Sequence, residues 1–454
     1  MAKTLIRDID YLLTDTRKEP LRGCSLLIDG PTIGWIGREP PKDLRPDRTI
    51  DGRGHLFLPG LINTHHHFFQ SLTRNLPQSQ DAKLFDWITE NFKVWRHLDH
   101  GMAAAAARTV AAELLLSGCT TSVDHCYMHP RHSPEIAAHE IQAVREMGLR
   151  FHLARGSLSP GFDLHPDIVQ DDDLVHKATQ SLIEDWHEAG PFGMTRICVG
   201  PCSLFNARMD LYRESRKMAD SYPGVQCHTH LAETRDEDAF CLGRFGKRPF
   251  DLMEEVGWVD GRCFHAHSVW LDDGEVGRMA TAGAGVAHCP VSNMRLGSGI
   301  APIVGMLRAG VHVGLGVDGS ASNDASHLFD ETRQSLLIQR IRYSESDITA
   351  RDVLTIATRG GAAVLGRDDI GTLAPGKAAD VIGVRLNQIQ FAGAVHDYVA
   401  ALIFCGVPRV DYSFVNGEMR VEKGEVVGVD LEEVIARQNE MALRIVKKAA
   451  EAAR

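Results

Sequence analysis

Residues 55–67 read HLFLPGLINTHHH, a short apolar run that ends in three histidines. Seven more apolar, β-branched runs follow it, and amphipathic stretches such as AAAAARTVAAELLLSG (103–118) separate them. Because parallel strands are buried on both faces, we interpret the runs as strands and the stretches between them as helices. Eight alternations of strand and helix predict an α/β fold with a (β/α)8 barrel. The predicted strands cover residues 55–65, 119–125, 149–157, 195–201, 225–233, 262–269, 284–290 and 312–319.

The two ends of the chain differ from the barrel segment, which we place at 57–370. Residues 1–56 and 371–427 hold short strands with turn signals, including the hairpin signal NG in FVNGEM (414–419). We expect both segments to form one small β-sandwich domain. Residues 428–454 predict an amphipathic terminal helix, for which internal packing and a dimer contact both remain open.

Composition excludes several classes of function. The 454 residues carry a formal net charge of -11, and no run of five Lys or Arg occurs, so nucleic acid is not an expected partner. No apolar run approaches the roughly 18–20 residues that span a bilayer, and the N-terminus lacks the apolar core of a signal peptide. The ten cysteines form no CxxC pair, which favours reduced thiols. We expect a cytoplasmic protein with no membrane partner.

Two histidines end the first predicted strand on the same face. His65 and His67 are two residues apart, so both imidazoles can face one metal while His66 points away. A His-rich turn also occurs by chance, so the pair alone does not establish a metal site.

Three later strands also end in polar side chains. Taken singly, each has an ordinary explanation as a core histidine, a surface glutamate or a helix N-cap. Because a barrel brings the carboxyl ends of its strands together, the whole set predicts a metal site that leaves a position open for water. The set comprises His228, His230 and Glu233 on the fifth run, His265 and His267 on the sixth, and Asp318 on the eighth.

Several of these segments resemble one enzyme family. The motifs are similar, in order, to those of the amidohydrolase superfamily, in its branch related to cytosine and guanine deaminases. The resemblance covers nearly the whole chain and implies a distorted (β/α)8 TIM barrel that hydrolyses C–N bonds in cyclic amidines. The segments are LPGLINTHHHFFQ (58–70), CHTHLAET (227–234), AHSVWL (266–271), AHCPVSNMRLGSGIAP (287–302) and GVDGSASND (316–324).

The same resemblance implies a catalytic apparatus. It implies one divalent metal per subunit, Zn²⁺ first and Fe²⁺ as the alternative, with His65, His67, His230 and Asp318 as ligands. Asp318 would take a proton from the attacking water, His267 would hold that water, and Glu233 would protonate the ring nitrogen. The fourth predicted strand offers no lysine of the kind that bridges two metals in binuclear relatives, which favours a single metal.

Within this branch, HHHFFQSLTRNLP (65–77) and the long stretch after Asp318 are most similar to 8-oxoguanine deaminases. That implies the conversion of 8-oxoguanine to urate and ammonia. Hydroxyatrazine-type s-triazine aminohydrolases and pterin deaminases share parts of the pattern and stay as alternatives. Two segments depart from the 8-oxoguanine group, LSPGFDLHPD (158–167) and PCSLFNARMD (201–210). Both should line the pocket, so the identity of the heterocycle stays open.

Three polar residues are candidates for substrate contact, namely Gln70, Arg74 and His288. A surface amide, a helix salt bridge and a loop brace are their respective alternatives. Other candidate pocket residues are Trp87, Phe92, Trp95, Tyr127 and Cys202. We expect a homo-oligomer, because barrels with such tails are often multimeric. A ring-opening amidase with two metals and a barrel that only binds its ligand are the competing classes.

Overall fold

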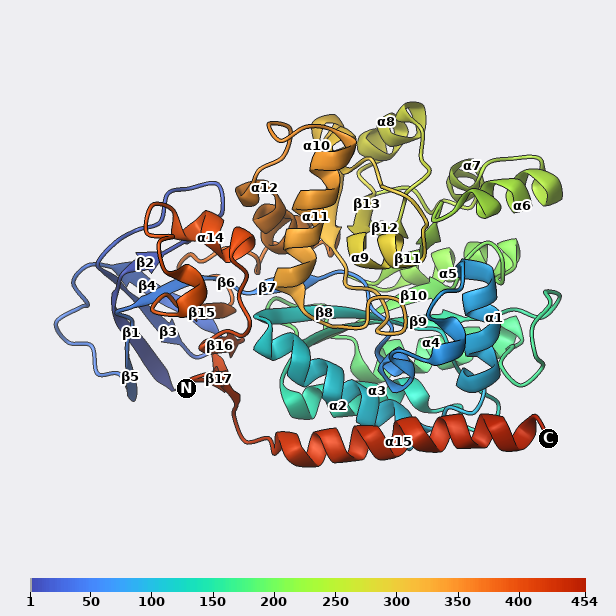
Figure 1. The fold of residues 1–454 in the computed structure, drawn as a ribbon, viewed down its shortest axis with the longest axis horizontal. Coiled ribbons are helices and arrows are strands. Elements are labelled where there is room, and N and C mark those ends of the chain that lie inside the picture. The colour runs from blue at the N-terminus through green and yellow to red at the C-terminus, as the bar shows by residue number, and fades with distance from the viewer. Residues whose placement is uncertain (1) are drawn as a thin grey trace.

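The computed structural model describes residues 2–454 and contains a closed barrel of eight parallel strands (Figure 1). The strand order is β10-β11-β12-β13-β14-β7-β8-β9. The predicted barrel is therefore confirmed. Its strands are β7 (Leu61–Asn63), β8 (Cys119–Cys126), β9 (Arg150–Ser157), β10 (Thr195–Pro201), β11 (Gln226–Leu231), β12 (Cys263–His267), β13 (Gly285–His288) and β14 (His312–Leu315).

The first predicted strand, 55–65, is in fact two strands in two different sheets. β6 (His55–Pro59) pairs with β15 (Val381–Arg385) outside the barrel, and β7 enters the barrel beside β8. Gly60 lies between them, where an added Cβ would fall 2.1 Å from Thr120 Oγ1. The prediction of one continuous strand is therefore wrong. The break was not visible in the sequence, because both halves are apolar and only this glycine separates them.

Helices surround the barrel and connect its strands. Their ends carry ordinary signals, such as the capping box of Asp272 and Glu275 at the start of α8 and the left-handed Gly283 at its end. These helices are α1 (Leu84–Trp95), α2 (His100–Leu116), α3 (Ile136–Met147), α4 (Asp172–Trp186), α5 (Met209–Ser221), α6 (Arg235–Phe245), α7 (Pro249–Glu255), α8 (Asp273–Ala282), α9 (Pro290–Arg295), α10 (Ile303–Ala309), α11 (Leu328–Arg342), α12 (Ala350–Thr355) and α13 (Gly361–Val364), with short helical turns at η1 (Phe68–Thr73), η2 (Pro77–Ser79) and η3 (Ile356–Gly360).

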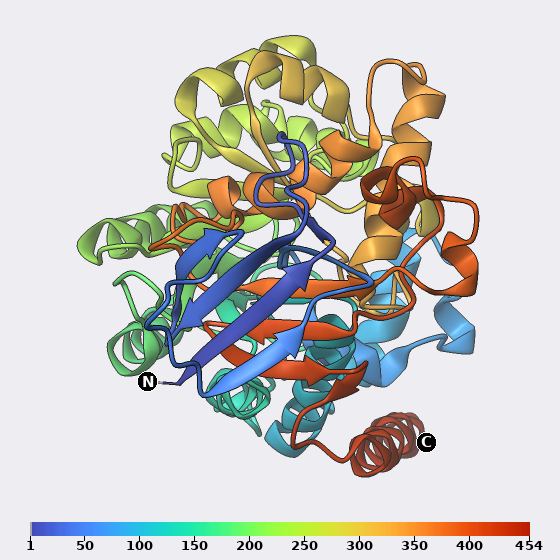
Figure 2. The same ribbon diagram turned by 90° about the vertical axis from the view of Figure 1, so that its left-hand side faces the viewer.

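The two ends of the chain form two sheets that pack face to face (Figure 2). One sheet has the order β4-β3-β1-β5 and the other β18-β17-β16-β15-β6-β2. Ile6 and Leu26 from the first sheet share one apolar core with Phe57, Val381 and Phe414 from the second. The remaining elements are β1 (Lys3–Ile9), β2 (Tyr11–Leu12), β3 (Cys24–Asp29), β4 (Thr32–Gly37), β5 (Arg48–Asp51), η4 (Ile389–Phe391), α14 (Tyr398–Phe404), β16 (Tyr412–Val415), β17 (Glu418–Glu422) and β18 (Glu425–Val426).

The terminal helix α15 (Leu431–Ala452) lies along α2 at the edge of the barrel (Figure 1). Gln438 Nε2 donates to Ser71 Oγ at 3.1 Å, and Arg444 and Lys448 both reach Asp99, the N-cap of α2. The helix therefore packs against its own chain, which was one of the two roles left open for it. The other role, a contact between subunits, stays a prediction.

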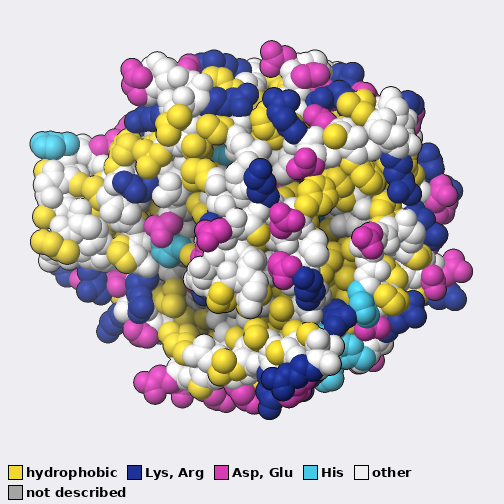
Figure 3. All heavy atoms as spheres, turned by 45° about the vertical axis from the view of Figure 1, so that its right-hand side comes forward, with side chains coloured by type: hydrophobic (Ala, Val, Ile, Leu, Met, Phe, Trp, Pro, Cys, Tyr) yellow, Lys and Arg dark blue, Asp and Glu magenta, His cyan; other side chains and the backbone are white. Residues whose placement is uncertain are grey.

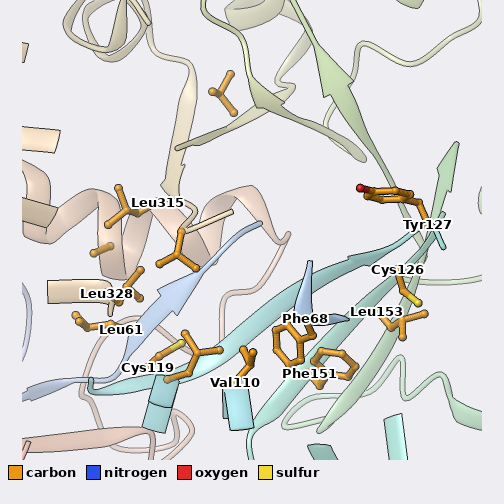
Figure 4. Packing of buried hydrophobic residues seen from close by; sticks show 14 of the residues in the cluster. Leu61, Phe68, Val110, Cys119, Cys126, Tyr127, Phe151, Leu153, Leu315 and Leu328 are labelled. Carbon is orange, nitrogen blue, oxygen red and sulfur yellow. The ribbon is translucent and has the colours of Figure 1, made fainter. Parts of the chain in front are cut away.

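The core beneath β8 is tightly filled (Figure 4). The rings of Phe68 and Phe151 lie 5.3 Å apart next to Val110, and the hydroxyl of Tyr127 points away from the apolar side chains (Figure 4). The ten cysteines are free, and Cys405 alone among them is exposed. Within residues 2–454, no helix has both the length and the apolar character needed to cross a membrane.

Candidate metal centre and active site

The carboxyl ends of β7, β11 and β14 bring three histidines and one aspartate together. His65 Nε2 and His67 Nε2 each lie 3.3 Å from Asp318 Oδ1, and His67 Nε2 lies 3.2 Å from His230 Nε2. His65, His67 and His230 each offer a ligand atom within 4.8 Å of the others. His65 and His67 project to the same side, as the spacing of two residues predicted.

A hydrogen-bonded chain fixes the tautomer of His65. His228 Nδ1 lies 3.0 Å from the carbonyl oxygen of Phe264, which can only accept, so this nitrogen carries the proton. His228 Nε2 is then the acceptor for His65 Nδ1–H at 2.8 Å. Burial lowers the pKa of both imidazoles well below the usual value, which keeps them neutral. The lone pair of His65 is therefore on Nε2, which faces the cluster and has no partner.

His67 and His230 are oriented in the same way by backbone carbonyls. His67 Nδ1 donates to the oxygen of His125 at 2.8 Å, and His230 Nδ1 donates to that of Cys202 at 2.7 Å. Their Nε2 atoms consequently face each other with lone pairs and no proton between them. Ligand atoms of a tetrahedral zinc with Zn–N bonds of about 2.0–2.1 Å are separated by about 3.3–3.4 Å. The donor set thus fits a divalent metal in both chemistry and spacing.

Asp318 supplies the negative charge of this cluster. Its Oδ2 accepts from Ser292 Oγ at 2.6 Å, and its Oδ1 accepts from the backbone N–H of Gly319 at 2.7 Å. Both of these donors favour the ionised form of the Asp318 carboxyl. The carboxylate therefore stays ionised in a buried position, which a metal cation would compensate.

Glu233 and His267 stand beside this cluster. His267 Nε2 lies 3.8 Å from both Glu233 Oε2 and Asp318 Oδ2, a separation that leaves room for a reacting atom among the three groups. Asn293 Oδ1 accepts from His267 Nδ1 at 2.9 Å, and Ser298 Oγ donates to Glu233 Oε1 at 3.1 Å. Burial raises the pKa of Glu233, so this carboxyl can hold a proton and release it.

The backbone at two of these strand ends is strained. Asp318 has φ 63° and His267 has φ 70°, a left-handed conformation that non-glycine residues rarely adopt. Each such residue costs roughly 1–3 kcal/mol, and strain of this kind gathers at functional sites. The side chains of these two strained residues lie close together, with His267 Nε2 3.8 Å from Asp318 Oδ2.

A pocket opens over the cluster. Its floor is polar, with His67, His230, Glu233, His267 and Asp318. Its walls are largely apolar, which suits a flat heterocycle that meets a few polar groups at one edge. The apolar wall residues are Leu84, Trp87, Ile88, Phe92, Tyr127, Phe205 and Leu296.

Comparison with known proteins places the chain in a family. Residues 56–420 match the family described as amidohydrolase. The chain belongs to the amidohydrolase family. The predictions of this family and of its hydrolase barrel are confirmed.

The amidohydrolase is similar to two curated enzymes and a solved structure over nearly its whole length. It is 43% identical to an 8-oxoguanine deaminase of Pseudomonas aeruginosa, over 98% of this chain and 100% of that protein. It is 35% identical to a hydroxydechloroatrazine ethylaminohydrolase of Pseudomonas sp. (strain ADP), over 95% and 93%. The crystal structure of an atrazine chlorohydrolase from Arthrobacter aurescens TC1, complexed with zinc, superposes with a TM-score of 0.91 at 34% identity, over 97% and 100%.

Some candidate substrate contacts of the amidohydrolase line the pocket and others do not. Gln70 lines it, with Nε2 donating to the Tyr127 hydroxyl at 3.1 Å and a buried Oε1 that has no partner. Arg74 lies outside, because its guanidinium pairs with Glu113 on α2. His288 is buried behind the pocket with both ring nitrogens unpartnered. Arg74 and His288 are thus not among the residues that line the pocket, and a substrate contact by either stays a prediction.

The other candidates divide in the same way. Trp87, Phe92, Tyr127 and Cys202 line the pocket, while the buried Trp95 donates its indole N–H to Thr73 Oγ1 at 2.9 Å. His265 also turns away from the metal ligands, with Nε2 bonded to the carbonyl oxygen of Trp258 at 2.9 Å.

Sequence reasoning missed several supporting residues. Ser292, Asn293 and Ser298 form hydrogen bonds with Asp318, His267 and Glu233 respectively, and all three lie within the motif AHCPVSNMRLGSG. Their small polar side chains carry no distinctive spacing, so only the motif itself could have indicated them. Glu237 also lines the pocket, where its Oε2 accepts from the backbone N–H of Glu233 at 3.1 Å.

Proposed function

We propose that this amidohydrolase deaminates 8-oxoguanine to urate and ammonia with one bound Zn²⁺ ion. The observation that carries the proposal is the convergence of three imidazole lone pairs and a carboxylate, beside Glu233 and His267, at the floor of an apolar pocket. The 43% identity to an 8-oxoguanine deaminase supports the choice of heterocycle.

The proposed ligands are His65, His67, His230 and Asp318, with Fe²⁺ as the alternative ion. When bound there, a divalent metal supplies a Lewis acid that brings the pKa of a coordinated water close to neutrality. The absence of a lysine from the fourth barrel strand, Thr195–Pro201, supports a single ion.

The protein side chains then divide the proton transfers. The carboxylate of Asp318 accepts the proton of the attacking water, and His267, whose Nε2 lies 3.8 Å from Asp318 Oδ2, orients that water. Glu233 donates its proton to the ring nitrogen next to the amino-bearing carbon, which makes that carbon electrophilic. The proton held by Asp318 then passes to the amino nitrogen, which departs as ammonia when the C–N bond breaks. The hydroxyl proton goes to Glu233 as the new carbonyl forms, which restores both carboxyl groups. Ser298 and Asn293 keep the two side chains in position.

Gln70 is the proposed polar contact on the substrate. Its buried, unpartnered Oε1 can accept from a ring N–H of the purine. Gly319 gives this amide its place, because an added Cβ there would fall 1.8 Å from Gln70 Oε1. The apolar walls cover the faces of the ring, and the metal ligands lie at the edge that reacts.

The experiment is ammonia release from a panel of heterocycles by the zinc-loaded protein. The panel contains 8-oxoguanine, guanine, isoguanine, isoxanthopterin and hydroxyatrazine, with ethylamine followed for the last. We expect strong turnover of 8-oxoguanine and a loss of about 10²–10⁴-fold in kcat for Glu233→Gln, with metal content unchanged. Turnover of the pterin or the triazine alone would replace the substrate and keep the chemistry. No turnover of any compound by the metal-loaded protein would refute the proposal.

A further inference from the structure

Two acidic side chains are buried deep inside the barrel domain. On the face of the molecule shown in Figure 3, Asp and Glu side chains are exposed to solvent and lie among Lys and Arg side chains. Asp124 on β8 and Glu140 on α3 are instead 0% exposed, and neither belongs to the proposed metal ligands or lines the catalytic pocket. A carboxylate in such a position requires a cation, a proton or several hydrogen-bond donors to compensate its charge.

The hydrogen bonds of residues 2–454 do not supply that compensation. Asp124 Oδ1 accepts from the backbone N–H of Phe68 at 2.5 Å. Asp124 Oδ2 and both carboxyl oxygens of Glu140 are buried without any donor. Neither carboxyl group is therefore paired with a cation, and two ionised carboxylates here would leave two uncompensated negative charges in the protein interior.

The unpartnered oxygens lie close to one another and to a thiol. Asp124, Cys126 and Glu140 each offer an oxygen or sulfur atom that lies within 4.8 Å of the other two. Two carboxylate oxygens only accept, so no hydrogen bond forms between them until one carries a proton. One proton between Asp124 Oδ2 and a Glu140 oxygen, with the Cys126 thiol donating to the other Glu140 oxygen, gives every oxygen of both carboxyl groups a partner.

Burial favours the protonated forms of all three groups. It raises the pKa of Glu140 to about 7 and, together with the charge of Glu140, raises the pKa of Asp124 well above its usual value. It also raises the pKa of the Cys126 thiol, which keeps its proton and stays a donor. Because a metal ion binds a deprotonated thiol, the same effect opposes a metal ion at this place.

The other ionisable groups near these carboxyl groups do not pair with them either. Arg155, opposite Cys126 on β9, donates from its guanidinium to Gln170 Oε1 at 2.6 Å and to a backbone carbonyl at 2.8 Å. His129 Nε2 is bonded to the carbonyl oxygen of Cys126 at 2.8 Å, and burial lowers the pKa of this imidazole well below its usual value. A shared proton is therefore the compensation that the two carboxyl groups themselves provide.

Two hydrogen bonds connect this part of the core to the proposed metal ligand His67. Phe68, whose N–H donates to Asp124, directly follows His67 in the chain. His125, which directly follows Asp124, accepts at its carbonyl oxygen from His67 Nδ1 at 2.8 Å. Asp124 thus holds the peptide group beside His67, and the residue next to Asp124 holds the imidazole. We propose that Asp124 and Glu140 share one proton and that the protonated pair positions His67. This inference goes beyond the deamination, and its effect on metal affinity rests on the proposed metal site.

The test exchanges the shared proton for the N–H of an amide. In Glu140→Gln the carboxamide nitrogen can donate to Asp124 Oδ2 and the carboxamide oxygen can accept from Cys126, so we expect the Kd for Zn²⁺ to stay within about twofold of the wild type. Asp124→Asn should behave in the same way. Glu140→Leu leaves Asp124 Oδ2 buried without a partner and should raise this Kd by about tenfold. Competition with a chromophoric chelator measures all three.

The matched control is Glu275→Leu, which removes another buried glutamate, bonded to Arg248 on a different helix. It should lower the urea midpoint, as Glu140→Leu does, without changing the Kd for Zn²⁺. Infrared difference spectra detect the proton itself. Near neutral pH, the wild type should show the carbonyl band of one protonated carboxyl group that both Glu140→Gln and Asp124→Asn lack.

The same carbonyl band in the wild type and both amide variants, or a second metal ion per chain that Glu140→Gln loses, would refute the shared proton. An unchanged Kd in Glu140→Leu, or an equal rise in Glu275→Leu, would refute the positioning of His67. If the wild type binds no metal ion at all, the proposed function fails, and the infrared comparison still decides whether the two carboxyl groups share a proton. That comparison does not require Glu140→Leu to fold.

Discussion

Two buried polar networks lie at opposite ends of the barrel and differ in how far their hydrogen bonds are satisfied. At the amino end, Arg150 donates to both oxygens of Asp380 at 3.1 and 3.0 Å and to two backbone carbonyls at 2.8 Å. At the carboxyl end, His65 Nε2 and Gln70 Oε1 are buried without any partner. The same barrel thus closes one network and leaves the other open.

This difference separates structural from functional polarity. A buried polar group is normally hydrogen-bonded, so an unpartnered one needs an explanation. At the carboxyl end, the proposed metal and heterocycle would provide it. At the amino end, Asp380 also accepts from the backbone N–H of Asn416 at 2.7 Å, so its charge joins the barrel to the terminal sheets.

The largest effect on stability is expected at the amino end. Arg150→Met leaves the Asp380 carboxylate buried without its cation, and breaking a buried pair in this way costs about 3–5 kcal/mol. We therefore expect a much lower urea midpoint, with kcat of the folded protein unchanged. Arg108→Met is the matched control, because Arg108 pairs with Glu146 on the surface and its loss should cost under about 1 kcal/mol. A fall in kcat with an unchanged midpoint would show that the two ends are not separate.

The sequence predicted the framework of this comparison but not its details. Alternating runs and their polar last residues indicated the barrel and a metal site at its strand ends, and the family resemblance implied His65, His67, His230 and Asp318 as the ligands. The break between two strands at Gly60 was not predicted, because the runs on both sides of it are apolar.

Side-chain direction was the second limit of the sequence. Arg74 follows the metal-ligand loop closely, yet it turns to Glu113 on a helix that lies far from it in the chain. Which carbonyl fixes which imidazole, as Phe264 does for His228, depends on neighbouring strands that only the folded barrel brings together.

A smaller effect, on metal affinity, is expected when the hydrogen bond between His228 and His65 is removed. His228→Phe keeps an aromatic ring against Phe264, now 4.1 Å away, but removes the acceptor for His65 Nδ1–H. Loss of a hydrogen-bond partner behind a metal-binding histidine lowers metal affinity by about 10–100-fold, and we expect a decrease of this size in His228→Phe. Competition with a chromophoric chelator would measure it. His228→Gln, whose carboxamide oxygen can accept, should recover part of the loss. His265→Gln is the control, because His265 bonds to Trp258 instead; an equal loss there would remove the specific role of His228.

The smallest effect concerns the pH dependence of the free energy of unfolding. As pH rises, a carboxyl group at the carboxyl end should lower this free energy, and one at the amino end should raise it. At the carboxyl end, burial raises the pKa of Glu331 to about 8, from 4.5. Glu331 accepts from the backbone N–H of Val291 at 3.0 Å and from Asn323 Nδ2 at 2.8 Å. The folded state holds a proton that the unfolded state releases, so this stabilisation is complete below about pH 4.5 and is lost as pH rises to about 8.

At the amino end the direction is reversed. Burial acts to raise the pKa of Asp369, but Arg367, bonded at 2.6 Å, holds it below the usual value. That stabilisation is present above about pH 4 and is lost on acidification. Between pH 5 and pH 8 the free energy of unfolding should fall by at least about 1 kcal/mol less in Glu331→Gln than in the wild type. Asp369→Asn should leave the change between pH 5 and pH 8 as it is and should reduce the loss of stability on acidification below pH 4. Urea titrations across pH measure both. If Glu331→Gln gave the same slope as the exposed control Glu451→Gln, the carboxyl end would hold no extra proton, and the contrast between the ends would be one of hydrogen bonding alone.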